Sequence, residues 1–266
     1  MGFAARLRTA LDELRPELPE HLTFAAWDLR EREPVTLDAE RPLQAASTIK
    51  TLIMIAALRA VDDGSLDLGQ PVDLPAERAG GSGVLREIPS AERLALGDLI
   101  NLMIVVSDNA ATNAVLDVVG FQAVADCARA LGAESTRVER RLMDHAAAGS
   151  NITTAADQAR ILDALATGLA LPEGLSRRAL NTLGRQQVRD RIPARTSPPA
   201  KVWNKTGELH GIRHDTALLG SGEPEVAIAV LVDGLTDPRS TKDYRGGPGT
   251  DAIATLGLAA WNALQG

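Results

Sequence analysis

The chain changes its hydrophobic period twice along its length. In the first 18 residues, apolar side chains recur at the spacing of one helix face, at Phe3, Leu7, Leu11 and Leu14. Residues 22–29 and 35–39 are short apolar runs on either side of a charged turn that contains a proline. This pattern predicts an amphipathic helix followed by two strands.

The middle of the chain follows the helical period almost throughout, and strand-like runs return only after residue 200. Stretches rich in glycine or proline, notably 79–83 and 195–200, separate the helical segments. The predicted helices are 48–62, 96–106, 111–119, 123–131, 154–167 and 175–186. The later predictions are strands at 201–207, 216–221 and 225–234, a hairpin at 208–215, and a closing helix at 250–264 with Ala254, Leu258 and Trp261 on one side.

Both ends of the chain therefore supply strands as well as helices, whereas the middle supplies helices. We predict an α/β domain built from residues 1–46 and 200–266, interrupted by an all-α domain at 47–199. A cleft between two such domains is a frequent place for a ligand site.

Composition limits the partners of the protein. The net charge is −7 and aromatic residues make up 3% of the chain, which argues against a nucleic-acid partner. No apolar run reaches the ~18 residues of a membrane span, so we expect no membrane contact. The N-terminal segment lacks the apolar core of a signal peptide, and the sequence as it stands indicates a cytoplasmic protein, with a removed leader as the alternative. Cys127 is the single cysteine, which excludes a disulfide framework, and we expect it to be buried in a helix.

Arginine supplies most of the positive charge. Lysine occurs only at Lys50, Lys201, Lys205 and Lys242 among the 28 basic residues. Arginine stays charged in proteins, whereas a buried lysine readily loses its proton. Each of these lysines is therefore worth testing for a chemical role.

Ser47 and Lys50 form an S-x-x-K motif at the start of a predicted helix. Residues three apart share a helix face, so the lysine can reach the serine hydroxyl. A lysine acts as a base only when neutral, and burial or a second cation lowers its pKa. The N–H groups at a helix start also favour an oxyanion. Taken alone, however, the motif is better explained by a serine that caps the helix.

The triplet Ser107-Asp108-Asn109 lies between two predicted apolar helices. The hydroxyl of Ser107 can relay a proton, and the side-chain amide of Asn109 can orient a substrate amide. A helix N-cap at this position is an equally good local explanation.

The triplet Lys205-Thr206-Gly207 ends a predicted strand. Gly207 lets a ligand approach the backbone closely, and the N–H of Glu208 can then be a second oxyanion donor. Thr206 can bond a substrate carboxylate, to which Lys205 adds positive potential. An exposed lysine and a turn glycine are the simpler alternative.

All three motifs in this order arise by chance in roughly one chain in ten thousand. Together they are the signature of class A β-lactamases and penicillin-binding proteins. The sequence resembles that superfamily over nearly its whole length, most closely class A-like serine hydrolases, because "GGSGVLREI", "MIVVSDNAATN" and "KTGELHGIRHD" lie where that family places them. The resemblance implies an α/β (α+β) fold with an antiparallel five-stranded sheet, flanking helices and an inserted all-α domain.

The resemblance also implies a role for each motif residue. Ser47 would be the nucleophile, Lys50 its base, and Ser107 the group that passes a proton to the leaving group. The backbone N–H groups of Ser47 and Glu208 would form the oxyanion hole. The residues expected to contact the substrate are Asn109, Lys205, Thr206 and Gly207, with Arg213 as a further partner for a substrate carboxylate.

The sequence departs from the class A pattern in one stretch. Class A β-lactamases carry a Glu-x-x-Leu-Asn segment that holds the deacylating water, and the corresponding stretch here, residues 135–157, has no such segment and is several residues shorter. Glu139 lies too early and is expected to be a solvated charge. Asp144 and His145 are candidate substitutes, although neither has the family spacing.

Other polar residues support weaker expectations. His210 and His214 flank Arg213, but their spacing is not that of a zinc site, so we expect no metal and no cofactor. The polar, glycine-rich segment 239–247, with Tyr244, is expected to form one rim of the cleft.

Three functions are compatible with these motifs. The leading hypothesis is a serine acyl-hydrolase or transacylase that forms an acyl-enzyme with a small amide, ester or lactam and deacylates poorly. The second is a genuine class A-type β-lactamase in which another group replaces the glutamate. The third, a non-enzymatic scaffold, is disfavoured because all three motifs are intact. The oligomeric state cannot be predicted from the sequence.

Overall fold

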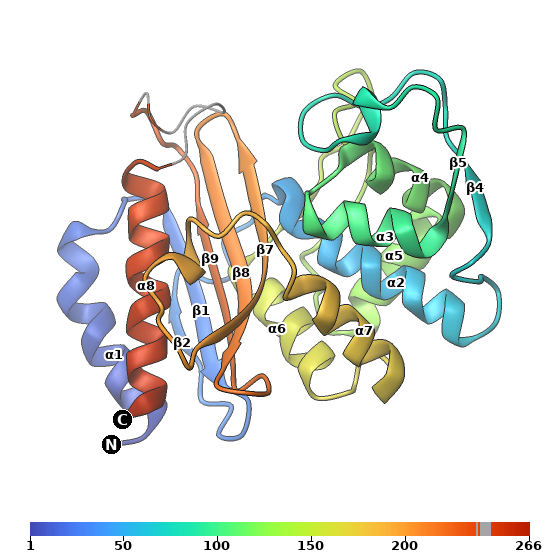
Figure 1. Cartoon of the computed structure of the whole chain (residues 1–266). Coiled ribbons are helices and arrows are strands. Elements are labelled where there is room, and N and C mark those ends of the chain that lie inside the picture. Colours follow the sequence, from blue (N-terminus) through green and yellow to red (C-terminus); the bar gives the residue numbers. More distant parts are fainter. Residues whose placement is uncertain (238, 240–245) are drawn as a thin grey trace.

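The computed structural model describes residues 1–237, 239 and 246–266. Figure 1 shows a central sheet with helices on both of its sides. The expected cleft rim at 239–247 lies largely outside the described residues, and Tyr244 is among the residues left out. The helices of the described chain are α1 (Phe3–Leu14), α2 (Lys50–Asp62), α3 (Leu96–Val105), α4 (Asn109–Val119), α5 (Phe121–Ala130), α6 (Ala155–Ala166), α7 (Glu173–Leu183) and α8 (Pro248–Gln265).

The main sheet has the order β2-β1-β9-β8-β7, and all its neighbouring strands are antiparallel. The predicted five-stranded antiparallel sheet is therefore confirmed. Every residue of the central strand β9 is buried, as its unbroken apolar run predicts. The strands of this sheet are β1 (Leu22–Asp28), β2 (Val35–Leu37), β7 (Lys201–Leu209), β8 (Ile212–Gly220) and β9 (Val226–Val232).

The hairpin between β7 and β8 differs from its prediction. The predicted hairpin at 208–215 consists mostly of strand residues, and only His210 and Gly211 remain between the two strands. Gly211 has φ of 70°, a conformation that glycine adopts without a steric penalty. Because the turn is this short, the ladder continues to the pair of Leu209 and Ile212.

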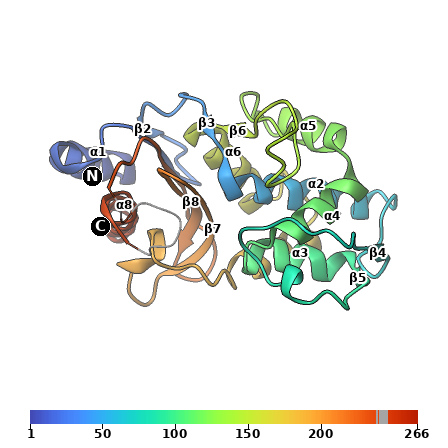
Figure 2. The ribbon, with the colours of Figure 1, turned by 90° about the horizontal axis from the view of Figure 1, so that it is seen from above.

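One face of the sheet is covered by α1 and α8, which lie side by side in Figures 1 and 2. The predicted apolar face of α1 is buried apart from Leu14, which is half-buried. Of the three residues predicted on one side of α8, Ala254 and Trp261 are buried and Leu258 is half-buried. The residues of α8 that belong to the core on this face are Ala252, Ile253, Leu256, Ala260 and Ala263.

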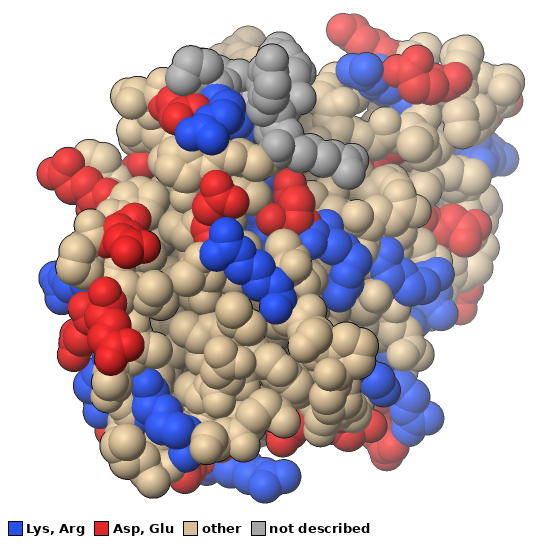
Figure 3. Space-filling model, turned by 60° about the vertical axis from the view of Figure 1, so that its left-hand side comes forward, with Lys and Arg blue, Asp and Glu red and all other residues tan. Residues whose placement is uncertain are grey.

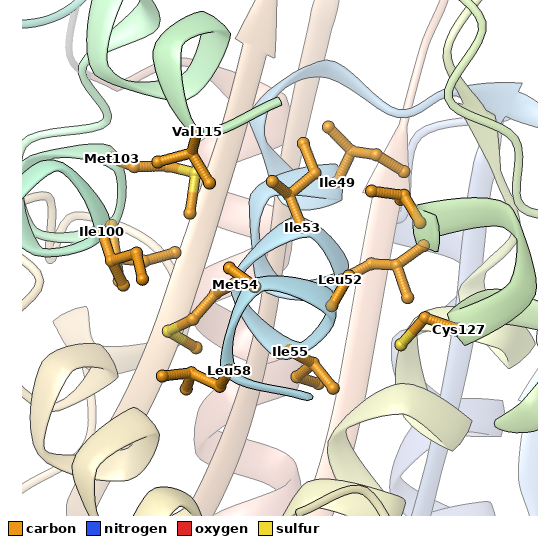
Figure 4. Packing of buried hydrophobic residues seen from close by; sticks show 14 of the residues in the cluster. Ile49, Leu52, Ile53, Met54, Ile55, Leu58, Ile100, Met103, Val115 and Cys127 are labelled. Atoms are coloured by element: carbon orange, nitrogen blue, oxygen red, sulfur yellow. The ribbon is translucent and has the colours of Figure 1, made fainter. Parts of the chain in front are cut away.

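Helix α2 is the centre of the helical part. It is buried on all sides from Lys50 to Leu58, so its apolar residues do not form a single stripe. Figure 4 shows Met103 and Val115 on one side of α2 and Cys127 on the other. Cys127 is 3% exposed, as predicted, and burial raises the pKa of its thiol to about 11.

The helix α6 packs on the sheet face opposite α1 and α8. Since α6 belongs to the segment 47–199, that segment contributes to the packing of both parts. The division of the chain into one domain of residues 1–46 and 200–266 and a second domain of residues 47–199 therefore remains a proposal.

Two short ladders, which the sequence did not predict, join loops of the helical part. They are β3 (Leu43–Gln44) with β6 (Ile152–Thr153), and β4 (Pro71–Asp73) with β5 (Arg93–Ala95). Within the described residues, no helix has the length and apolar character needed to span a bilayer. The cytoplasmic location stays a prediction.

Candidate active site

Ser47 lies at the junction of the sheet part and α2. It is the second residue of a 3-10 turn, Ala46–Ile49, which joins β3 directly to α2. Ala46 has φ of 47°, a left-handed conformation that costs a non-glycine residue roughly 1–3 kcal/mol. Such strained residues cluster at active sites, where the surrounding structure holds them. Ser47 is half-buried and lines a cavity of about 580 Å³.

Lys50, the first residue of α2, is fully buried. Its Nζ lies 2.7 Å from the carbonyl oxygen of Ser107, 2.8 Å from Oδ1 of Asn109 and 3.1 Å from Oγ of Ser107. Burial, followed by the charge of Lys205, lowers the pKa of Lys50 well below its usual value. A neutral amine has two hydrogens, which suffice for the two carbonyl-type acceptors, and a lone pair that remains available as a base.

Ser107 connects the two buried lysines. Its Oγ lies 3.0 Å from Nζ of Lys205 as well as 3.1 Å from Nζ of Lys50. Ser107 is buried and has φ of 56°, so it is a second strained residue beside the cavity. This arrangement allows a proton to move between the two lysines through one hydroxyl.

Asp108 has a structural role, in agreement with the alternative reading of the triplet as an N-cap. Its Oδ1 accepts from the N–H of Ala111, and its Oδ2 accepts from the N–H groups of Val84 and Leu85. A Cβ at Gly83, where φ is 118°, would lie 2.3 Å from Cγ of Asp108. The glycine-rich loop is therefore held against the start of α4 by this carboxylate.

Asn109 is the first residue of α4 and is also buried. Its Oδ1 accepts from Lys50, and its Nδ2 donates to the carbonyl oxygen of Gly80 at 2.9 Å. Asn109 lines the same cavity as Ser47, so its second amide hydrogen is placed to meet a substrate.

The third motif lies on β7, the edge strand of the sheet, which runs beside the Ser47 turn. Burial lowers the pKa of Lys205 to about 7. Gly207 faces the turn, where an added Cβ would lie 3.1 Å from Cβ of Ala46 and 3.1 Å from Cγ2 of Thr48. A side chain at this position would therefore require the turn that carries Ser47 to move away from β7 by a few tenths of an ångström.

Arg191 was missed by the sequence analysis. It is 1% exposed, and its Nη1 donates to the carbonyl oxygens of Gly207 and His214 at 3.1 and 2.8 Å. Its Nη2 donates to Oε2 of Glu208, whose side chain is 42% exposed and lines the cavity. The local sequence "VRDRIPAR" contains three arginines, and nothing in it distinguishes the buried one.

The stretch that lacks the class A glutamate contributes Leu142 and Met143 to the cavity lining. The side-chain amide of Asn113 accepts from the N–H of Leu142 at 2.8 Å and donates to its carbonyl oxygen at 3.1 Å. Leu142 is therefore held at both backbone groups. Asn113 lies four residues after Asn109 in α4, a spacing that the sequence analysis could have used.

The candidate substitutes in this stretch lie differently. The carboxylate of Asp144 accepts from the N–H groups of Ala146 and Ala147 at 3.2 and 3.1 Å. His145 lines a smaller neighbouring cavity of about 60 Å³, which it shares with Ala46. Glu139, expected to be a solvated charge, is exposed and accepts from the N–H of Ser150.

Arg213 is buried on β8, opposite Glu208 in the ladder. Its Nη1 donates to the carbonyl oxygens of Leu209 and Ile212 at 3.1 and 2.8 Å. It is not among the residues that line the cavity around Ser47. Its expected role towards a substrate carboxylate therefore stays a prediction.

The two histidines beside Arg213 differ in burial. His210 lines the cavity, whereas His214 is fully buried. Nδ1 of His214 accepts from the N–H of Val232 at 3.1 Å, and its Nε2 lies 2.9 Å from the carbonyl oxygen of Gln44. Burial lowers the pKa of His214 to about 4, so it is neutral at pH 7 and ties β8 to the strand before Ser47.

Other surfaces offer less chemistry. The described residues contain no group of three or more His, Cys, Asp or Glu side chains placed to hold a metal ion. A separate hollow of about 420 Å³ lies between α1 and α8 and contains none of the motif residues. On the face in Figure 3, acidic and basic side chains are intermingled.

Comparison with known proteins identifies the family. The sequence pattern of the beta-lactamase enzyme family matches residues 6–264. A beta-lactamase from Sphaerobacter thermophilus is similar in structure, with a TM-score of 0.83 and 30% identity over 99% of this chain and 97% of that one. The fold thus defines a serine hydrolase, and the chain belongs to the beta-lactamase enzyme family.

Two more distant structures share the fold. An ancestral class A beta-lactamase has a TM-score of 0.85 at 24% identity, over 97% of this chain and 99% of that one. A mutant of PBP-A, solved as an acyl-enzyme complex with penicillin G, has a TM-score of 0.84 at 22% identity, over 99% and 96% of the two chains.

Proposed function

We propose that this serine hydrolase forms an acyl-enzyme at Ser47 with a small amide, ester or lactam, and that it deacylates slowly or transfers the acyl group to another acceptor. One observation carries the proposal. The cavity contains Ser47, but its lining from the stretch that lacks the class A glutamate is apolar, with Leu142 and Met143. Among the described residues that line the cavity, Glu208 is the only carboxylate, and it is ion-paired with Arg191.

The acylation half combines Ser47, which lines the cavity, with the buried side chains of Lys50 and Ser107. Neutral Lys50 takes the proton of the Ser47 hydroxyl, whose oxygen attacks the substrate carbonyl carbon. The N–H groups of Ser47 and Glu208 stabilise the oxyanion. As the bond to the leaving group breaks, Ser107 gives that group its proton and recovers one from Lys50, which becomes neutral again.

The substrate-contact roles are part of the same proposal. Asn109 donates to the substrate amide, and Thr206 bonds the leaving-group side of the substrate beside Lys205. Gly207, which has no side chain, lets the leaving-group side of the substrate lie close to the backbone of β7. Arg213 is kept as a proposed contact because its guanidinium lies on the strand next to Glu208.

The genuine β-lactamase remains the second candidate. It is favoured by the similarity to the Sphaerobacter thermophilus beta-lactamase, at 30% identity. In that case a water must be activated by a group other than a class A glutamate, and Asp144 or His145 are the proposed replacements.

Intact-mass measurement with benzylpenicillin tests both candidates. We expect a persistent adduct of one penicillin on the wild-type chain and none on Ser47→Ala, with Ser65→Ala as the control that keeps the adduct. Ser65 is exposed and lies in the turn after α2. Rapid turnover of nitrocefin without any accumulating adduct would instead identify a β-lactamase.

The substitution Leu142→Glu tests the proposed slow deacylation of the acyl-enzyme. Because Asn113 fixes the backbone of Leu142, a glutamate at this position would present its carboxylate to the cavity as a general base. We expect the adduct to decay at least about tenfold faster, whereas Leu142→Gln should leave its lifetime close to that of the wild type. Equal lifetimes in the two variants would show that deacylation is limited elsewhere.

A further inference from the structure

The side chains of β7 alternate between two faces, and one face carries a charged pair beside the motif. Asn204, Thr206 and Glu208 share a face, since residues two apart on a strand point the same way. On this face Asn204 donates to Asp215, and Glu208 accepts from Arg191. Thr206 therefore lies between a neutral amide and an ion pair.

Arg191 is oriented towards Glu208 by the backbone. Its Nη1 is held by the carbonyl oxygens of Gly207 and His214, which leaves Nη2 directed at the Glu208 carboxylate. Its Nε lies 3.6 Å from Oδ1 of Asp190. The guanidinium of Arg191 is thus already bonded to the carboxylate of Glu208 and is buried, so it does not offer its charge to a substrate carboxylate beside Thr206.

Glu208 itself is accessible from the cavity. Its side chain is 42% exposed, compared with 1% for Arg191. A carboxylate on the leaving-group side of a substrate would lie beside Thr206 and would therefore approach the Glu208 carboxylate. Like charges placed against each other across a binding site reduce affinity.

We propose that Glu208 determines substrate selectivity. Its carboxylate is bonded to Arg191, and its negative charge disfavours substrates that carry a carboxylate beside Thr206. The preferred substrates are therefore amides and esters that are uncharged on that side. The inference rests on the proposed acyl-enzyme function and adds a substrate class to it.

A matched pair of thioesters tests the proposal. One is the hippuryl thioester of thioglycolic acid, and the other is the same thioester with a carboxamide in place of the carboxylate. The released thiol is followed with a disulfide chromogen, and the measured quantity is the ratio of the second-order rate constants, carboxylate over carboxamide. Glu208→Gln and Glu208→Thr should both raise this ratio at least about tenfold, mainly through tighter binding of the carboxylate substrate.

Glu134→Gln is the control, because it removes one negative charge from an exposed site after α5 and outside the cavity lining. It should keep the wild-type ratio. An unchanged ratio in both Glu208 variants would overturn the proposal while leaving the acyl-enzyme function intact. If wild-type protein released no thiol from either substrate, the proposed function itself would fail.

Discussion

At the residue scale, two buried lysines meet at one hydroxyl. Nζ of Lys50 and Nζ of Lys205 lie 3.1 and 3.0 Å from Oγ of Ser107, in a region from which water is largely excluded. Two ammonium groups at this distance repel each other, so the charge of one favours the neutral form of the other. Burial and a second cation, which is Lys205, therefore both lower the pKa of Lys50.

The first prediction concerns this repulsion. Lys50 must be neutral to act as a base, so acylation should rise with pH through its pKa. Lys205→Met removes a charge that lowers the pKa of Lys50, and the midpoint of the pH profile should therefore move to higher pH. The profile is measured as the rate of acylation by a fluorescent penicillin.

Lys205→Arg serves as the matched variant because it keeps the charge. Its midpoint should stay closer to that of the wild type than the midpoint of Lys205→Met. If Lys205→Met and the wild type had the same midpoint, Lys205 would not control the protonation of Lys50.

At the element scale, the site depends on the distance between β7 and the Ser47 turn. Gly207 lies where a Cβ would be 3.1 Å from Cβ of Ala46 and 3.2 Å from the carbonyl oxygen of Ala45. These neighbours belong to the turn that carries the nucleophile, and Ala46 is already strained at φ of 47°. A shift of this turn would move Ser47 relative to Lys50 and the N–H of Glu208.

We therefore predict that Gly207→Ala slows acylation by benzylpenicillin by at least about tenfold, because small misplacements of a nucleophile have large effects on rate. Gly174→Ala is the control, since an added Cβ at this position in α7 meets nothing within 4 Å. It should raise the thermal midpoint slightly and leave acylation unchanged. Wild-type acylation rates in Gly207→Ala would mean that the turn tolerates the extra methyl group.

The sequence analysis was accurate for elements with a clear period. Each predicted helix from 48–62 to 250–264 is present to within a few residues, as is the buried strand β9. The predictions were less accurate where tertiary contacts determine the secondary structure. The hairpin at 208–215 was predicted to separate the two strands, although pairing with β7 and β9 keeps Arg213, His214 and Asp215 in strand β8.

At the scale of the whole molecule, the helical core and the sheet are joined by chain segments that cross between them several times. α2 follows directly on the Ser47 turn, and α6 packs on the sheet. Trp203 on β7 packs against the core around α2 as well as against the cluster at α6. We therefore expect the two parts to unfold together.

The third prediction follows from this coupling. Ile53 is fully buried in the core around α2, and Ile53→Ala should lower the free energy of unfolding by about 2–5 kcal/mol. Urea unfolding is followed by far-UV circular dichroism and by the fluorescence of Trp261 on α8, in a background with the other tryptophans replaced by phenylalanine. Both signals should shift to the same lower midpoint.

Ile88→Ala is the control, because Ile88 is 45% exposed. It should change the free energy of unfolding by no more than about 0.5 kcal/mol. Separate midpoints for the two signals in Ile53→Ala would show that the sheet part folds independently of the helical part.

The sequence by itself determined the fold class, the order of the elements and the three motifs, because hydrophobic period and short-range spacing are local properties of the chain. Only the tertiary structure decided how the motifs combine. Ser107 bonds Lys50 and also a second lysine, which lies 98 residues after Ser107 in the chain. The backbone carbonyl groups of β7 and β8 orient Arg191 towards Glu208. No local pattern carries such contacts, because burial and the charges of residues distant in the chain together lower the pKa values of the two lysines.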